Sequence, residues 1–452
     1  MSAASTASSG GSASRDGVRT VAARVLATAL EAKSPVGALL ETARVGLSSR
    51  DQGLLHELVL GTLRWLRFVD FVLETAAARP LSKIDADLVP TLRVAVYQLL
   101  YLDRLPSHAV VHAAVEDIKR RSHRGAAGFA NAILRKVAQR RDPRKRSIEW
   151  PIDTGDPVED LATETSYPTF LVRRWVERFG KERAASALAA GNRRAGFQLT
   201  CLVDRDELAA ELAIEGVETQ PAEISAWGLA VLAGDPRKTE AFRSGKFYIQ
   251  DQASQAAAVI PMPAPGDRIL DVAAAPGGKS FSLLAAEPGI GLVAADVSLA
   301  RVLRLRSNQE RLRRGFGLAV ASGEQPSFRG GFDRVIVDLP CTGTGTFARH
   351  PELKWRISEG ELSRLAARSL EMLIPSADLV AVGGCLCAIT CSLEREENED
   401  VFAEFLDRRP DFELEPLELA PEHAPFVAGP GLWRVLPSAK HDGFTVHVLR
   451  RP

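Results

Sequence analysis

The chain has 452 residues, of which 46% are hydrophobic and 25% are charged, as in ordinary soluble globular proteins. Its 57 Lys and Arg residues equal its 57 Asp and Glu residues, which excludes a strongly basic or acidic protein and leaves only the distribution of charge as a clue to partners. The 5 cysteines of so long a chain exclude a disulfide framework and favour a reducing cytoplasm, and the length predicts two or three domains.

The first part of the chain changes character near residue 17. Residues 1–16 are small and polar without an apolar core, so we expect a disordered tail and not a secretory signal. Apolar residues then recur with the spacing of amphipathic helices up to about residue 140, and no alternation typical of strands appears. Residues 17–142 are therefore predicted to form an all-α bundle.

The end of this predicted bundle concentrates positive charge in a chain that is neutral as a whole. Such a cluster is often only a solvated helix face, but it also suits the neutralisation of phosphates. We favour RNA binding as the interpretation. The cluster consists of Lys119, Arg120, Arg121, Arg124, Arg135, Lys136, Arg140, Arg141, Arg144, Lys145 and Arg146.

The remainder of the chain predicts a linker and two further domains. Residues 143–165 are rich in Pro, Asp and Thr and are predicted to be a linker. Residues 166–245 combine helical segments with short apolar runs such as "FQLTCLV" and "GLAVLA", which predicts a small α+β subdomain. In residues 246–452 buried-strand runs alternate with helices, as in a doubly wound α/β sheet, and no run is long enough to span a bilayer.

One loop of this predicted sheet ends in Gly-Gly-Lys-Ser, as nucleotide phosphate loops do. In "ILDVAAAPGGKSFSLLA", residues 269–285, Ala273 stands where a phosphate loop requires its first Gly, and the pattern G-x-G-x-x-G is also absent. The small residues still let the backbone approach a ligand, and the start of the helix favours an anion such as a carboxylate. Asp296 ends the next strand at the spacing of an acid that binds ribose hydroxyls. The loop and Asp296 together predict a site for a nucleoside with a carboxylate tail, such as S-adenosylmethionine. The alternative is that the loop is a tight turn without a ligand.

Two other predicted strands are followed by cysteines, Cys341 in "VIVDLPCTGTG" and Cys391 in "CAITCSLEREENE". The carboxyl ends of strands line the ligand crevice of such sheets, so both thiols are expected beside the ligand. Lys279 and the start of the helix after Cys391 are candidates for lowering the pKa of a thiol. The alternative for a free thiol is burial as an inert side chain, which is what we expect of Cys385 and Cys387. A metal site formed by Cys385, Cys387 and Cys391 is a third interpretation, but these residues lack standard ligand spacing and a nearby His partner.

A thiol beside a methyl donor suits a reaction at carbon 5 of a pyrimidine, which is a poor nucleophile. Addition of a thiolate to carbon 6 turns the ring into an enamine, and carbon 5 can then attack the methyl group. A base removes the carbon 5 proton and the thiol is eliminated. Asp338, close to Cys341 in sequence, is a candidate for hydrogen bonding the base edge. Two cysteines permit one to attack and the other to assist release, and these residues alone do not say which does which.

These motifs carry a family resemblance. The chain resembles the Sun (RsmB-type) family of ribosomal RNA cytosine-carbon-5 methyltransferases: "AAAPGGKS", "DLPCTGTG" followed by "RHPELKW", and "TCSLEREENE" match, in order, its donor loop and its two cysteine motifs. "GKFYIQDQASQ" and "HDGFTVHVLRR" resemble the start and the closing strand of its catalytic domain. "LVLGTLRWLRFVD" and "GFANAILRKV" resemble the NusB-type RNA-binding domain of this subfamily, and residues 166–245 resemble its RNA-recognition-like subdomain.

The resemblance implies a multidomain protein: an all-α NusB-like domain, the small α+β subdomain and, over residues 246–452, a Rossmann-like class I S-adenosylmethionine methyltransferase domain. It implies methylation of one cytosine of small-subunit (16S) ribosomal RNA, with S-adenosylmethionine as cofactor. Cys391 would be the nucleophile, Cys341 would assist release, and Asp338 and Lys279 would line the reacting centre. We further expect no membrane or metal partner, a monomer and a cytoplasmic location.

The resemblance also implies a cofactor site, in which Ser322 stands where the family commonly has an Asp after the third strand. Leu339 likewise replaces a usual Ala. The implied cofactor-binding residues are Ala273, Ala274, Ala275, Pro276, Gly277, Gly278, Lys279, Asp296, Arg301, Ser322 and Asp338.

Two rival functions belong to other classes. The first is a non-catalytic RNA-binding ribosome-assembly factor with a decayed methyltransferase domain, and the intact Cys341, Cys391, Lys279 and Asp338 argue against it. The second is an amine methyltransferase, which would prefer Asn/Asp-Pro-Pro-aromatic where this chain has Asp-Leu-Pro-Cys.

Overall fold

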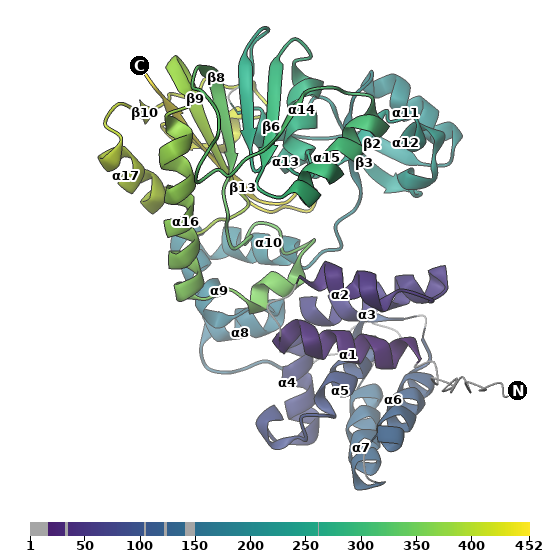
Figure 1. Cartoon of the computed structure of the whole chain (residues 1–452). Helices are drawn as coiled ribbons and strands as arrows, with labels where there is room; N and C mark the ends of the chain where they lie inside the picture. Colours follow the sequence, from purple (N-terminus) through teal and green to yellow (C-terminus); the bar gives the residue numbers. More distant parts are fainter. Residues whose placement is uncertain (1–16, 32–34, 104, 122–123, 141–149, 261) are drawn as a thin grey trace, which may run out of the picture. The chain divides into compact units, whose positions relative to one another are not determined.

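The computed structural model describes residues 17–31, 35–103, 105–121, 124–140, 150–260 and 262–452, and the structural statements below refer to these residues. The chain divides into two compact units, Met1–Arg173 and Arg174–Pro452 (Figure 1). The expected tail, residues 1–16, lies outside the described residues. In the part of the chain that is described, no helix is both long and apolar enough to cross a membrane.

Every regular element described in the first unit is a helix, which confirms the all-α prediction. Helix α5 carries a nearly continuous buried surface and packs against α1, α3, α4, α6 and α7. The helices are α1 (Val18–Glu31), α2 (Val36–Ala43), α3 (Ser49–Arg64), α4 (Leu66–Ala77), the 3-10 turn η1 (Leu81–Lys83), α5 (Val89–Tyr101), α6 (Ser107–Arg121), α7 (Arg124–Gln139) and α8 (Pro157–Thr165).

Helix α8 lies inside the segment predicted to be a linker, so that segment is not irregular throughout. The Asp156 side chain accepts a hydrogen bond from the Val158 N–H, and Pro157 occupies the first turn, where its missing N–H has no consequence. The acidic and Pro-rich composition that suggested a linker is therefore, in part, the composition of a capped helix start.

A small antiparallel sheet in the second unit has the strand order β2-β3-β1-β4. Three of its strands fall in the predicted α+β subdomain, but β4 lies beyond the predicted end at residue 245 and completes the sheet by pairing Ile249 with Leu199 of β1. A three-residue strand has too little pattern to be recognised without its partner. The elements of this region are α9 (Thr169–Phe179), α10 (Lys181–Gly191), β1 (Gln198–Cys201), α11 (Arg205–Ile214), β2 (Glu218–Pro221), β3 (Gly228–Ala233), η2 (Pro236–Lys238), α12 (Glu240–Arg243) and β4 (Phe247–Ile249).

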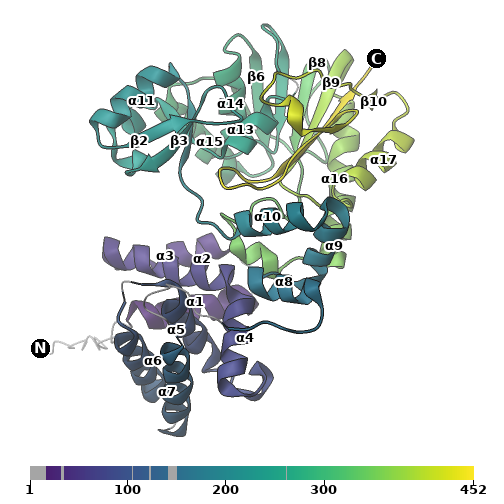
Figure 2. The same ribbon diagram turned by 180° about the vertical axis from the view of Figure 1, so that it is seen from behind.

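The large sheet has the order β11-β12-β13-β9-β8-β5-β6-β7. Strands β5 to β9 are parallel, which confirms the doubly wound prediction, whereas β13 runs antiparallel to β9 and to β12. The C-terminal strands, yellow in Figure 2, lie beside β9 and include the short strands β11 and β12, which the sequence did not reveal. Strand β5 lies between β6 and β8: the strands β6 and β7 are added on one side of β5, and β8 and β9 are added on the other. The point in a parallel sheet where the strand order changes direction in this way is the usual place for a ligand.

The elements from residue 252 to the C-terminal strand follow one another along the chain as strands and covering helices. They are α13 (Gln252–Ala258), β5 (Arg268–Val272), α14 (Gly278–Ala286), β6 (Gly291–Asp296), α15 (Leu299–Leu312), β7 (Gly317–Val320), β8 (Phe332–Asp338), η3 (Pro351–Trp355), α16 (Glu359–Ala377), β9 (Val380–Thr390), α17 (Glu399–Arg408), β10 (Glu413–Leu414), η4 (Ala424–Phe426), β11 (Val427–Gly429), β12 (Leu432–Val435) and β13 (Phe444–Arg450).

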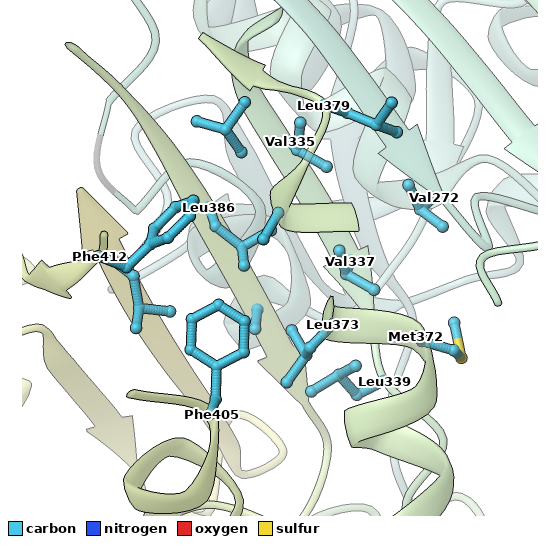
Figure 3. Close-up of a cluster of buried hydrophobic side chains, with 14 of the residues drawn as sticks. Val272, Val335, Val337, Leu339, Met372, Leu373, Leu379, Leu386, Phe405 and Phe412 are labelled. Atoms are coloured by element: carbon cyan, nitrogen blue, oxygen red, sulfur yellow. The ribbon is translucent and has the colours of Figure 1, made fainter. Parts of the chain in front are cut away.

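Both faces of this sheet are buried, as the continuous apolar runs of its strands require. On one face, side chains of β8 and β9 such as Val337 and Leu386 pack against Leu373 of α16 and Phe405 of α17 (Figure 3). On the other face a second cluster joins α13 and α14 to the strands, with Ile336 among its members. The two layers hold the strand ends in place.

Replacement of Phe405 by Ala should remove a fully buried ring that packs edge-on against Phe412 at 5.6 Å. We expect the free energy of unfolding of the second unit to fall by about 3–5 kcal/mol, the usual effect of such a cavity. Urea-induced unfolding measures it. Val382→Ala on β9, where the side chain is 77% exposed, is the control and should change stability by less than about 0.5 kcal/mol. Equal effects of the two substitutions would contradict the core assignment.

Candidate active site

The carboxyl ends of the five parallel strands open at one edge of the large sheet. Asp271 lies in β5, Asp296 ends β6, Ser322 follows β7, Asp338 ends β8 and Cys391 follows β9. Because the strands are parallel and in register, side chains that are far apart in sequence reach the same edge. The structure therefore brings the residues of the implied cofactor site and both cysteine motifs to one end of the sheet.

The loop from Ala273 to Gly278 turns sharply from β5 into α14. Ala273 and Gly277 both have positive φ values, 61° and 108°. A Cβ at Gly277 would lie 2.3 Å from Leu305 Cδ1 and 2.8 Å from a Phe281 ring carbon, so this position excludes a side chain. Among the described residues no side chain caps the start of α14, which leaves its first N–H groups without a side-chain acceptor.

Asp296 and Arg301 hold this loop against β6. The buried Asp296 carboxylate accepts hydrogen bonds from the backbone N–H groups of Ala275 (3.3 Å) and Ser298 (3.1 Å). Arg301 donates to the Ala275 carbonyl at 2.7 Å and lies 3.3 Å from Asp296. The Oδ1 atom of Asp296, which accepts only the Ser298 N–H among the described residues, keeps lone-pair capacity for a further donor such as a hydroxyl.

The ends of β6 and β7 form an apolar rim that the sequence did not reveal. Val297, directly after Asp296, is 61% exposed, and Val320, the last residue of β7, is 52% exposed. Ser322 lies just beyond, where its Oγ accepts the Glu324 N–H at 3.1 Å. With Ser in place of an Asp, this side of the site carries a neutral hydroxyl and exposed apolar surface.

Three ionisable side chains, Asp271 of β5, Lys279 of α14 and Asp338 of β8, belong to neighbouring elements. Asp271 is fully buried: Ser280 Oγ donates to its Oδ2 at 2.5 Å, and its Oδ1 has no hydrogen-bond partner among the residues described. Burial raises the pKa of Asp271 to about 7, against the opposing effects of Ser280 and Lys279.

Lys279 Nζ lies 2.7 Å from Asp338 Oδ2, with 12% of the lysine side chain and 39% of the aspartate side chain exposed. Burial alone would lower the pKa of Lys279, but the negative charges of Asp338, Asp271 and Cys391 together raise it. A buried ammonium group is thereby maintained within electrostatic reach of the Cys391 sulfur.

The two sulfur atoms of the cysteine motifs are 3.2 Å apart. The hydrogen bond between the thiols, followed by burial, raises the pKa of Cys341 well above its usual value. Cys341 therefore retains its proton near neutral pH while its sulfur stays in hydrogen-bond contact with Cys391. Cys385 and Cys387 are buried inside β9, as predicted, and their inertness stays a prediction.

The expected help from a helix start beside Cys391 is wrong. Helix α17 begins only at Glu399, and residues 391–398 form a separate turn. Asn398 gives this turn its shape: its Oδ1 accepts from Thr390 Oγ1 at 2.8 Å, and its Nδ2 donates to the Glu394 carbonyl at 2.7 Å. The polar residues that suggested a helix are used for bonds within the turn.

Glu397 is a site residue that sequence reasoning missed. Its buried carboxylate accepts hydrogen bonds from the Thr342 N–H (2.7 Å) and Thr342 Oγ1 (2.6 Å). Burial raises its pKa to about 7 in spite of these bonds. The only sign in the sequence was an acid within "TCSLEREENE", where several neighbouring acids obscure it.

The basic cluster of the first unit is partly neutralised within its own helices. Lys119 pairs with Glu116 at 3.4 Å, and Arg120 and Arg121 both pair with Asp117. Arg135 and Arg140 are exposed, and Lys136 Nζ donates to the Ala76 carbonyl at 3.0 Å. The remaining predicted members fall outside the described residues or, for Arg124, have no described side chain; they are Arg124, Arg141, Arg144, Lys145 and Arg146. RNA binding by this cluster stays a prediction.

A doubly wound sheet closed by an antiparallel strand, with an uncapped helix start after β5 and an acid at the end of β6, defines the class of S-adenosylmethionine-dependent methyltransferases. Comparison with known proteins narrows this class. The family model of 16S rRNA methyltransferase RsmB/F matches residues 258–450, and that of the NusB family matches residues 17–139.

Relatives match almost the whole chain. A probable ribosomal RNA small subunit methyltransferase B of Bacillus subtilis (strain 168) is 33% identical over 429 residues, which cover 90% of this chain and 92% of that protein. The ribosomal RNA small subunit methyltransferase B of Pseudomonas putida is 32% identical over 434 residues, which cover 94% of this chain and 96% of that protein. The crystal structure of PH0851 has a TM-score of 0.75 at 25% identity and covers 96% of this chain and 98% of that one. The chain belongs to the ribosomal RNA small subunit methyltransferase B family.

Asp271→Asn should change the pH dependence of stability. The pKa of Asp271 is raised to about 7 in the folded protein, so its favourable contribution is full below its ordinary value and is lost as pH rises through about 7. When the pH rises from about 5 to about 8, the free energy of unfolding of the wild type should fall by on the order of 2 kcal/mol more than that of the variant. Calorimetric unfolding at both pH values measures the difference. Glu310→Gln, an exposed position on α15, should follow the wild type, and an opposite sign for Asp271→Asn would contradict the burial argument.

Proposed function

We propose that this member of the family methylates carbon 5 of a cytosine in small-subunit (16S) ribosomal RNA through a covalent adduct between Cys391 and carbon 6 of the base. The single observation that carries the proposal is the pair of sulfurs, 3.2 Å apart, at the ends of adjacent strands and within reach of the Lys279–Asp338 ion pair. A methyltransferase acting on an amine has no use for a nucleophilic thiol, because the nitrogen lone pair attacks directly.

The residues at the strand ends fit S-adenosylmethionine. The bare Gly277, the uncapped start of α14 and the unpartnered Asp271 Oδ1 provide close backbone approach, N–H donors for a carboxylate and an acceptor for an amino group. When bound, the cofactor supplies an electrophilic methyl group. The residues that would hold it are Ala273, Ala274, Ala275, Pro276, Gly277, Gly278, Lys279, Asp296, Arg301, Ser322 and Asp338, with Val297 and Val320 as apolar surface for a base ring.

Asp338 supports recognition of cytosine. A carboxylate accepts a hydrogen bond from the exocyclic amino group of cytosine, whereas uracil presents an oxygen at that position and would be repelled. Lys279 holds Asp338 by direct contact at 2.7 Å, and the aspartate side chain is exposed enough to reach a base. The pair therefore favours cytosine over uracil and orients its ring above Cys391.

The reaction then uses the two thiols in sequence. Cys391, as a thiolate near the Lys279 ammonium, forms a bond to carbon 6, and the displaced electron pair makes carbon 5 nucleophilic. After methylation a base removes the carbon 5 proton, the bond between sulfur and carbon 6 breaks, and its electron pair returns to Cys391. Cys341, which keeps its proton, assists this elimination by donating a hydrogen bond to the departing sulfur.

The NusB-like first unit supports a role in holding the RNA. Its exposed Arg135 and Arg140, with the basic residues that follow in sequence, are suited to phosphate contacts. The rival function, an assembly factor with a decayed transferase domain, rests on Ser322 alone, because the Lys279–Asp338 pair and both sulfurs are in place. Transfer of labelled methyl groups to RNA separates the two functions, and bisulfite sequencing identifies the base.

Cys391→Ala should abolish methyl transfer, since no sulfur remains to add to carbon 6, while RNA binding is retained. Label transfer from S-adenosylmethionine to small-subunit RNA should fall by at least about 10⁴-fold, as for other removed nucleophiles. Cys201→Ala is the matched control, because it removes a buried thiol of the small sheet and should leave activity near the wild-type level. Appreciable turnover by Cys391→Ala would overturn the nucleophile assignment.

Cys341→Ala should trap the covalent enzyme–RNA complex. Attack by Cys391 does not need Cys341, but elimination loses the thiol that donates to the departing sulfur. In the presence of RNA and S-adenosylmethionine, denaturing gel electrophoresis should show a denaturant-resistant band that the double variant Cys341→Ala/Cys391→Ala lacks. Free turnover of Cys341→Ala without such a band would refute its role in release.

A further inference from the structure

A single buried carboxylate lies between the two loops that carry the cysteines. Glu397 Oε1 accepts from the Thr342 N–H at 2.7 Å, and Oε2 accepts from Thr342 Oγ1 at 2.6 Å. The Ser392 side chain lies close enough to the same carboxylate to lower its pKa, against the effect of burial. Thr342 directly follows Cys341 and Ser392 directly follows Cys391, so one carboxylate interacts with the neighbours of both sulfurs.

Glu397 is itself held rigidly by the turn to which it belongs. Trp175 Nε1 donates to Glu394 Oε1 at 2.9 Å, and Arg174 Nε donates to Glu394 Oε2 at the same distance. Asn398 Nδ2 donates to the Glu394 and Ser392 carbonyls. Residues 391–398 are thus held by hydrogen bonds to helix α9 and by hydrogen bonds within the turn. Because Glu397 belongs to this turn, its hydrogen bonds to Thr342 fix the position of Thr342 relative to the turn.

Other bonds join the two loops, but they lie farther from Cys341. The Gly345 N–H donates to the Cys391 carbonyl at 2.9 Å, and the Leu393 N–H donates to Thr344 Oγ1 at 2.8 Å. These bonds keep the loops together when Glu397 is removed. What the loss of Glu397 changes is the placement of residues 341 and 342 relative to residue 391.

We infer that Glu397 is a positioning residue that fixes the two cysteine sulfurs in register for successive attack and release. Two thiols cooperate in elimination only if their separation is maintained after the base has been bound, and misplacement by about 1 Å costs roughly a hundredfold in rate. The catalytic consequence rests on the proposed function, whereas the effect on the distance between the sulfurs does not.

The test compares Glu397→Ala with Glu397→Gln in the full-length protein. Gln is nearly isosteric, and its amide oxygen accepts the Thr342 N–H while its NH₂ donates to the Thr342 hydroxyl. The first measurement uses protein without RNA or cofactor and the oxidant diamide. Cys341 and Cys391 each give up one proton and one electron as the S–S bond forms, and the N=N bond of diamide takes up both protons and both electrons. Peptide mapping by mass spectrometry identifies the disulfide.

We expect the rate of Cys341–Cys391 disulfide formation to fall at least about tenfold in Glu397→Ala and to stay within about threefold of wild type in Glu397→Gln. Glu396→Ala is the matched control from the same turn. Glu396 pairs with Arg174 and, in the described structure, is hydrogen bonded to neither Thr342 nor Ser392. The control should therefore keep the wild-type rate of disulfide formation. A wild-type rate in a folded Glu397→Ala protein would refute the inference.

The second measurement is catalytic. In Glu397→Ala, kcat should fall about ten- to a hundredfold with the Kd for RNA unchanged, and the covalent enzyme–RNA band should accumulate because release is impaired. Unchanged kcat with slowed disulfide formation would refute the catalytic consequence alone. Wild-type protein that forms the disulfide quickly but transfers no methyl group to RNA would refute the proposed function and leave the positioning role standing.

Thr342→Val provides a second variant in case Glu397→Ala does not fold. It removes the bond from Thr342 Oγ1 to Glu397 and leaves the backbone N–H bond intact. We expect an intermediate slowing of disulfide formation, about threefold, with the thermal midpoint close to that of the wild type. A rate equal to that of the wild type in this variant would contradict the inference.

Discussion

The parallel register of β8 and β9 is the constraint on which the rest of the site depends. Asp338 pairs with Ile389, and the Leu339 N–H continues the ladder to the Ile389 carbonyl at 2.9 Å. Each strand is then followed within a few residues by its cysteine, so the register decides that the two sulfurs meet. A slip of one residue would turn every side chain of a strand to the opposite face. The buried layers of helices on both faces make such a slip costly.

Burial and a small number of charges set the chemistry at this edge. Lys279 is a buried cation among Asp271, Asp338 and a sulfur, and each negative neighbour favours its charged form. Burial raises the pKa of Asp271, and the hydrogen bond to Cys391, followed by burial, raises the pKa of Cys341. Groups that lie close together therefore differ in how strongly they hold a proton. Such differences between neighbouring groups are what the proposed division of roles between the two thiols requires.

Helices and strands with a regular spacing of apolar residues could be predicted from the sequence. Short strands, and segments shaped by local side-chain hydrogen bonds, could not. The helices of the first unit and the strands β5 to β9 follow from apolar periodicity, which burial on one or two faces imposes. Strands β4, β11 and β12 have three or four residues and exist only through their partners, so no local pattern marks them. Polar residues misled in two places: they cap helix α8 within the supposed linker, and they shape the turn after Cys391 in place of a helix start.

The order of motifs along the chain determined by itself the domain classes, the family and the residue types that the chemistry needs, because glycines, acids and cysteines at strand ends are local features. Only the tertiary structure decided the 3.2 Å separation of Cys341 and Cys391, the contact of Lys279 with Asp338 and the bridging position of Glu397. These are contacts between residues far apart in sequence. They depend on strand order and register, which are products of the packed core and have no signature in any one segment.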